Sequence, residues 1–207
     1  MNEQYYYITI NYHRGKGFFP TLIKWFTNSN IAHVSVSLVG TNSPLEDEYE
    51  SGKHVDSDVN ILTHLNNISG RNLVMTYDAD LGREMIGYRG MPNDKRLVAR
   101  DIFRVNHPVF MTAHEHLVSC LGTGYDYSGV LGFVFRGIKQ DEKRLFCSES
   151  VGYILNILSG GSLGTLMVDR GNLSPRDINL MATAILAKRK EYGIRVEHPV
   201  DLEEKSK

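Results

Sequence analysis

The stretch Arg144-Leu145-Phe146-Cys147-Ser148-Glu149-Ser150-Val151-Gly152 decides how the rest of the chain is interpreted. A short apolar approach ends in a cysteine, and the residues that follow have helical periodicity. Apolar side chains recur three or four positions apart, at Val151, Ile154 and Leu158. This spacing predicts a helix with Cys147 in its first turn.

The first turn of a helix favours the ionised form of a cysteine. The N–H groups there have no partner within the helix, and the peptide dipoles add partial positive charge. Cys147 falls on the same side as Val151 and Ile154, so its sulfur is expected to face the element on which the helix packs. The alternative is that Cys147 is only a small buried apolar residue, as free cysteines most often are. A base on the facing element would decide between these two readings.

A histidine begins the polar face of a predicted strand. In the stretch 31–39 the residues alternate, with Val34, Val36 and Leu38 on one face and His33 and two serines on the other. A single histidine in such a position is usually a solvated or hydrogen-bonded surface group. Together with a helix-borne cysteine, His33 becomes the candidate base.

The acidic stretch after this strand contains a candidate partner for the histidine. A turn at 40–44 is followed by residues 46–52, which we expect to return as an antiparallel strand with Glu50 near His33. The alternative is that this acidic run is a solvated edge strand.

The remaining patterns predict an α+β fold in which an antiparallel sheet packs against the cysteine-bearing helix. Further strands are expected at 5–12 and 97–105, and further helices at 20–28, 108–121 and from Pro175 onward. The signals are weak in 56–95, apart from a strand-like run at 73–77. We expect this segment to be an insertion or to cover a cleft.

The length and charge of the chain limit the classes of protein to which it can belong. The chain has 207 residues and no evident linker, which favours a single domain over residues 1–207. Lys and Arg number 23 and Asp and Glu 24, so the formal net charge is −1. This balance disfavours binding to nucleic acid or to an anionic membrane.

The N-terminal residues and the cysteine count point to a reducing compartment. Met1–Tyr7 has no basic, apolar and small-residue blocks of a secretory signal, and the chain has two cysteines, Cys120 and Cys147. We expect a cytoplasmic protein without an integral membrane segment, because no apolar run approaches the roughly 20 residues needed to cross a bilayer. A disulfide between the two cysteines has no support in the sequence.

No metal or cofactor site is predicted. His114 and His116 lie two positions apart on a predicted helix and so point to different sides, whereas zinc-binding pairs on helices are four apart. Gly122 and Gly124 follow a helix and not a strand, so they do not form a dinucleotide fingerprint.

The order of these motifs resembles a known family. The pieces are 27–34 with His33, Glu50-Ser51, Tyr125-Asp126, Phe146-Cys147-Ser148-Glu149 and Ser174-Pro175-Arg176-Asp177. In this order they resemble the circularly permuted branch of the NlpC/P60 papain-like cysteine hydrolases, the YiiX-like proteins of bacteria and phages. The histidine precedes the cysteine here, as in that branch.

The resemblance implies a metal-independent thiol hydrolase with a papain-like fold. Cys147 is then the nucleophile, His33 the general base and Glu50 the group that orients the imidazole, while Tyr125 and Ser148 are candidates for oxyanion or substrate positioning. The expected partner is a substrate with a peptide or acyl-amide bond, such as a peptidoglycan stem or a lipid amide. An acyltransferase with the same dyad and a non-catalytic binding or structural protein remain alternatives, and the oligomeric state is left open.

Overall fold

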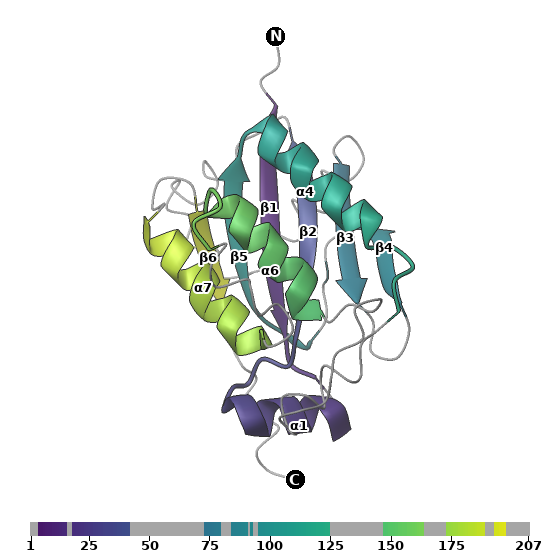
Figure 1. Cartoon of the computed structure of the whole chain (residues 1–207), viewed down its shortest axis with the longest axis vertical. Coiled ribbons are helices and arrows are strands. Elements are labelled where there is room, and N and C mark those ends of the chain that lie inside the picture. Colours follow the sequence, from purple (N-terminus) through teal and green to yellow (C-terminus); the bar gives the residue numbers. More distant parts are fainter. Residues whose placement is uncertain are drawn as a thin grey trace.

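A six-stranded antiparallel sheet forms the centre of the protein in the computed structural model (Figure 1). The structure describes residues 4–15, 18–41, 73–79, 84–90, 92, 95–124, 147–163, 173–188 and 193–197. The strands are β1 (Tyr5–His13), β2 (His33–Thr41), β3 (Leu73–Ala79), β4 (Met85–Arg89), β5 (Leu97–Val105) and β6 (Gly193–Glu197). Their order in the sheet is β4-β3-β2-β1-β5-β6, and each neighbouring pair is antiparallel. The α+β class predicted from the sequence is confirmed.

Three helices cover one face of the sheet. They are α4 (His107–Ser119), α6 (Cys147–Leu158) and α7 (Pro175–Lys188), and Figure 1 shows them side by side in front of the strands. The fourth helix, α1 (Phe18–Thr27), lies across the end of the sheet where β1 ends and β2 begins. No helix among the described residues is long and apolar enough to span a bilayer.

The core lies between these helices and the apolar face of the sheet. The register pairs Ile10 with Val36 and Tyr12 with Val34, so these four side chains share one face, as the alternation in the sequence predicts. They belong to the same buried cluster as the apolar side of α6, including Ile154. Burial of this alternating face against the helical stripe determines which face of β2 points away from the helices.

The opposite face of the central strands is polar and nevertheless buried. It carries side chains that are each at most 4% exposed: Thr9, Asn11, His13, Ser35, Ser37, Thr76 and Arg100. Their hydrogen bonds run across four strands, from β3 to β5. A buried polar face of this kind is tolerated only when its groups are paired with one another.

Part of the segment 56–95 forms β3 and β4, which make up one side of the sheet. Residues 56–72 lie outside the described part of the chain, so an insertion or a cleft cover there stays a prediction. The antiparallel partner that we expected for β2 at 46–52 is instead β3, and β1 occupies the other edge of β2. The residues 46–52 themselves lie outside the described part of the chain.

Candidate active site

Cys147 is the first residue of α6, as the sequence predicts. Its side chain is 1% exposed and belongs to the buried cluster between the helices and the sheet. The local sequence explains this placement, because the apolar stripe of α6 holds the helix against the sheet and Cys147 continues that stripe into the first turn. The helix therefore directs its positive N-terminal end toward the beginning of β2 (Figure 1).

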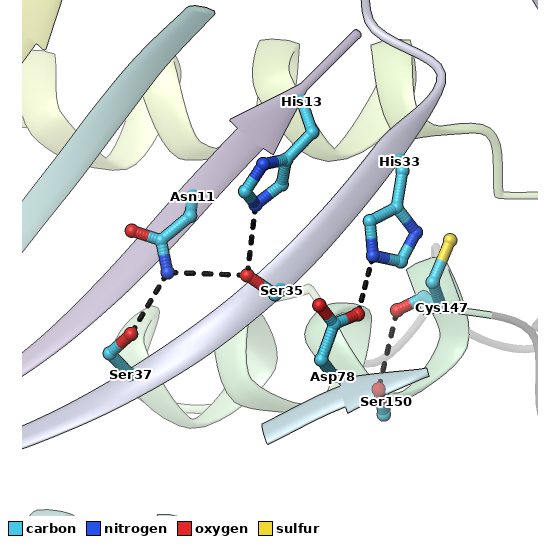
Figure 2. A network of polar contacts seen from close by, with 8 residues as sticks. All are labelled: Asn11, His13, His33, Ser35, Ser37, Asp78, Cys147 and Ser150. Atoms are coloured by element: carbon cyan, nitrogen blue, oxygen red, sulfur yellow. Dashed lines mark hydrogen bonds and ion pairs between the residues drawn. The ribbon is translucent and has the colours of Figure 1, made fainter. Parts of the chain in front are cut away.

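His33 begins β2 and lies between a sulfur and a carboxylate. Its Nε2 atom is 2.5 Å from Oδ1 of Asp78, and the two side chains are 14% and 22% exposed. Figure 2 shows the sulfur of Cys147 beside the other ring nitrogen, Nδ1. The predicted meeting of Cys147 with His33 is therefore present in the structure.

The electrostatic environment favours a protonated imidazole. Burial by itself lowers the pKa of His33, but the charge of Cys147 and hydrogen bonds with Asp78 and Cys147 outweigh it and raise this pKa to about 10. Burial likewise raises the pKa of Asp78, whereas the hydrogen bond and charge of His33 lower it, so that the net shift is downward. The site thus holds a protonated ring between an ionised carboxylate and the sulfur.

Asp78 reaches His33 because of the register between β2 and β3. Ser37 is paired with Thr76, so these two residues share a face, and residues two positions further along each strand share it too. On β2 this face continues through Ser35 to His33, and on β3 it continues to Asp78. The two strands therefore carry the histidine and the aspartate to the same end of the sheet.

Sequence reasoning missed Asp78, although a signal was present. The strand-like run was expected to end at residue 77, and continuing its alternation by one more residue would have placed Asp78 on the polar face with Thr76. The sequence pattern instead favours Glu50 for the orienting role, because it predicts 46–52 as the neighbour of β2. Glu50 and Tyr125 both lie outside the described residues, so their assignments stay predictions.

Ser148 follows Cys147 in the first turn of α6. Its side chain is fully buried, and its hydroxyl donates a hydrogen bond to the backbone carbonyl of Leu173, just before α7. The hydroxyl therefore ties the first turn of α6 to the chain entering α7. This contact is structural, and the expected role of Ser148 in oxyanion or substrate positioning stays a prediction.

The second cysteine provides a contrast within the same chain. Cys120 is free and buried like Cys147, and its sulfur lies 3.8 Å from Nε2 of His116. It caps the C-terminal end of α4, where the helix dipole disfavours a thiolate. Burial raises the pKa of Cys120, and a hydrogen bond with Ser119 only partly offsets it. A neighbouring histidine therefore does not by itself favour a thiolate. The position on the helix distinguishes Cys147, at an N-terminus, from Cys120, at a C-terminus.

The arrangement of Cys147, His33 and Asp78 is suited to nucleophilic catalysis. It places a sulfur at a helix N-terminus, a protonated imidazole beside it and a carboxylate on the far ring nitrogen. Comparisons of the chain with protein family models, with curated proteins and with solved structures found no match. Any assignment of function must therefore come from the geometry of this site.

Proposed function

We propose that this protein is a cysteine hydrolase that cleaves amide or peptide bonds through an acyl-enzyme on Cys147. The observation that carries the proposal is the position of His33, whose two ring nitrogens face the sulfur of Cys147 and the carboxylate of Asp78. A structural cysteine needs neither of these partners. The proposal agrees with the resemblance to the permuted NlpC/P60 hydrolases, in which Asp78 would take the orienting role assigned to Glu50.

In the first half of the reaction, the Cys147 thiolate attacks the carbonyl carbon of the substrate and a carbon–sulfur bond forms. The resulting oxyanion would be stabilised by backbone N–H groups at the start of α6. His33 then donates its proton to the leaving nitrogen, the carbon–nitrogen bond breaks and the amine departs. Asp78 holds the ring in the orientation that this transfer requires.

In the second half, His33 is neutral and acts as a base. It takes a proton from a water molecule, whose oxygen attacks the thioester carbon. Loss of the sulfur from this carbon releases the carboxylic acid and restores the pair of thiolate and protonated imidazole. An amine or alcohol in place of water would make the same site an acyltransferase, and products formed in the presence of added acceptors would reveal this.

The test is alkylation of the two cysteines by iodoacetamide over a series of pH values, followed by mass spectrometry of the two peptides. We expect Cys147 to be alkylated faster than Cys120 below neutral pH, and this preference to disappear in His33→Ala. The full chain contains its own control, because both cysteines are buried and each has a histidine nearby.

Equal and slow alkylation of both cysteines would contradict the proposal. It would favour a binding or structural protein that keeps the fold without turnover.

If Cys147 is preferentially alkylated, the next measurement is hydrolysis of a panel of peptide and acyl-amide substrates. Comparison of the unaltered protein with Cys147→Ala would identify the substrate class.

A further inference from the structure

A second histidine lies directly against the first. His13, at the end of β1, is the register partner of His33 at the start of β2. The ring centroids are 5.6 Å apart and the ring planes are tilted by 38°, while the side chain of His13 is only 4% exposed. The ring of His13 therefore covers the side of the His33 ring that faces β1 (Figure 2).

A chain of hydrogen bonds leads from a buried arginine toward His13. The Nε atom of Arg100 can only donate, and it lies 2.7 Å from Oδ1 of Asn11. This contact fixes the orientation of the Asn11 amide, so its Nδ2 group donates to Ser37 at 3.0 Å and to Ser35 at 3.3 Å. The Oγ atom of Ser35 is thus already an acceptor.

The same chain determines which atom donates to the ring of His13. Its Nε2 lies 3.1 Å from Oγ of Ser35, a residue that is 1% exposed. Within the described part of the chain, the contacts of this hydroxyl are those with Asn11 and His13. Its hydrogen is therefore satisfied only if it points to Nε2, because a hydrogen on Nε2 would leave the hydroxyl hydrogen without an acceptor. Nε2 must accept, and the hydrogen of the ring is then on Nδ1.

We propose that His13 is a positioning residue of the site, held as the neutral Nδ1–H tautomer by the chain Arg100–Asn11–Ser35 and packed against the ring of His33. The inference rests on the proposed function, since it concerns the support of the same imidazole. In this scheme His13 acts on the site through the ring of His33.

The charged groups around His13 explain why its neutrality matters. Among the described residues they include His33 on β2, Asp78 on β3, and Arg100 on β5, which is connected to His13 through Asn11 and Ser35. Arg96, just before β5, also acts on Asp78. A positive His13 would repel the protonated His33 and compete with it for Asp78. A neutral ring in this place provides packing without that competition.

The first test reads the tautomer directly, by long-range ¹H–¹⁵N correlation of the histidine rings in the full chain. We expect His13 to carry hydrogen on Nδ1 and none on Nε2 from about pH 5.5 to about pH 8, where a histidine in water would titrate. The ring signals of His13 are identified as those that disappear from the spectrum of His13→Phe. In Ser35→Ala the ring of His13 loses the hydroxyl that donates to Nε2, and we expect His13 to gain a second hydrogen between about pH 8 and about pH 5.5. Hydrogen on Nε2 or on both nitrogens at neutral pH would overturn the inference.

The second test is the pH profile of iodoacetamide alkylation of Cys147. His13→Phe retains a neutral ring, so we expect the midpoint of the profile to stay within about 0.3 pH units. His13→Ala removes the ring that packs against His33, so that His33 is held less firmly beside the sulfur, and we expect the midpoint to rise by about 1 pH unit. An upward shift in the Phe variant would mean that His13 is charged, and no shift in the Ala variant would mean that it does not position His33. Either result overturns the inference.

These outcomes are separate from the fate of the proposed function. If Cys147 in the unaltered protein is alkylated no faster than Cys120, the hydrolase proposal fails whatever the tautomer of His13. If Cys147 is preferentially alkylated but its profile does not respond to His13→Ala, only the role of His13 is lost.

Discussion

At the scale of single residues, the proposed function depends on the charges of three neighbouring side chains. His33 lies between Asp78 and Cys147, and both neighbours contribute to raising its pKa to about 10 against the opposing effect of burial. A protonated ring at neutral pH is what an ion pair with a thiolate requires, and it is also the acid that a leaving amine requires. Changes to either neighbour should therefore alter the titration of the ring between them.

Replacement of Asp78 by asparagine tests the orienting carboxylate. Asp78→Asn removes a charge that raises the pKa of His33, so this pKa should fall. Because His33 must be protonated to donate to the leaving amine, the alkaline limb of hydrolysis should move to lower pH, with a rate reduced on the order of 10²- to 10⁴-fold. The measurement is the pH dependence of hydrolysis, with Glu115→Gln, at an exposed position of α4, as the control carboxylate. An unchanged alkaline limb would exclude Asp78 from the orienting role.

Replacement of Cys147 by alanine tests the other neighbour. The charge and hydrogen bond of Cys147 contribute to the raised pKa of His33, so Cys147→Ala should bring this pKa down while the contact with Asp78 remains. An NMR titration of the imidazole measures the shift, and Cys120→Ala is the matched control. Equal titration of His33 in both variants would show that the sulfur does not interact with the ring.

At the scale of elements, the site lies where the ends of helices and strands pack together. The N-terminus of α6 carries Cys147, and the contact between Ser148 and Leu173 ties that turn to the start of α7. Arg176, in the first turn of α7, in turn donates to the backbone carbonyl of Thr27 at the end of α1, at 2.7 Å. The start of α7 thus connects α6 with the segment that leads to His33.

The start of α7 is stabilised by a reciprocal cap that can be tested. Asp177 Oδ2 accepts from the backbone N–H of Ser174 at 2.9 Å and from its hydroxyl at 2.7 Å, while the N–H of Asp177 lies 3.2 Å from that hydroxyl. Asp177→Ala should lower the free energy of unfolding by about 0.5–2 kcal/mol, measured by urea denaturation. Ser174→Ala removes the same cap from the other side, so the two effects should not add in the double variant. Full additivity would contradict a shared cap.

At the scale of the whole molecule, a second buried network holds the far side of the sheet together. Asp101 on β5 is fully buried and accepts from Tyr12 on β1 at 2.6 Å and from Arg195 on β6 at 2.6 and 2.7 Å. Arg195 also donates to Asn179 on α7 at 2.7 Å. Burial and the charge of Asp101 raise the pKa of Tyr12 well above its usual value, so its hydroxyl remains a donor. Three strands and a helix therefore depend on one carboxylate.

Removal of the arginine should affect stability more than removal of the tyrosine hydroxyl. Arg195→Met leaves the buried charge of Asp101 without its cation, and we expect a loss of about 3 kcal/mol in the free energy of unfolding. Tyr12→Phe removes one hydrogen bond and should cost about 1–2 kcal/mol. Both are measured by chemical denaturation. A loss below about 0.5 kcal/mol in Arg195→Met would mean that the pair does not hold β6 in place.

Local pattern was sufficient to predict much of this protein from its sequence. The helix that begins at Cys147, the strand that begins at His33 and the helix after Ser174 follow from periodicity and capping residues, which depend only on neighbours along the chain. The sequence pattern predicts neither β4 nor β6, and it predicts β3 only as a strand-like run.

The identity of the residues that support His33 was decided by the tertiary structure alone. Asp78 and His13 reach it because β3 and β1 pair with the two edges of β2, a choice that involves residues far apart in the sequence. Alternation tells which face a side chain occupies, but not which strand lies beside it. The sequence by itself therefore determined the candidate nucleophile and the candidate base, whereas strand pairing determined the carboxylate behind the imidazole and the second ring against it, because pairing is selected by the packing of the whole sheet.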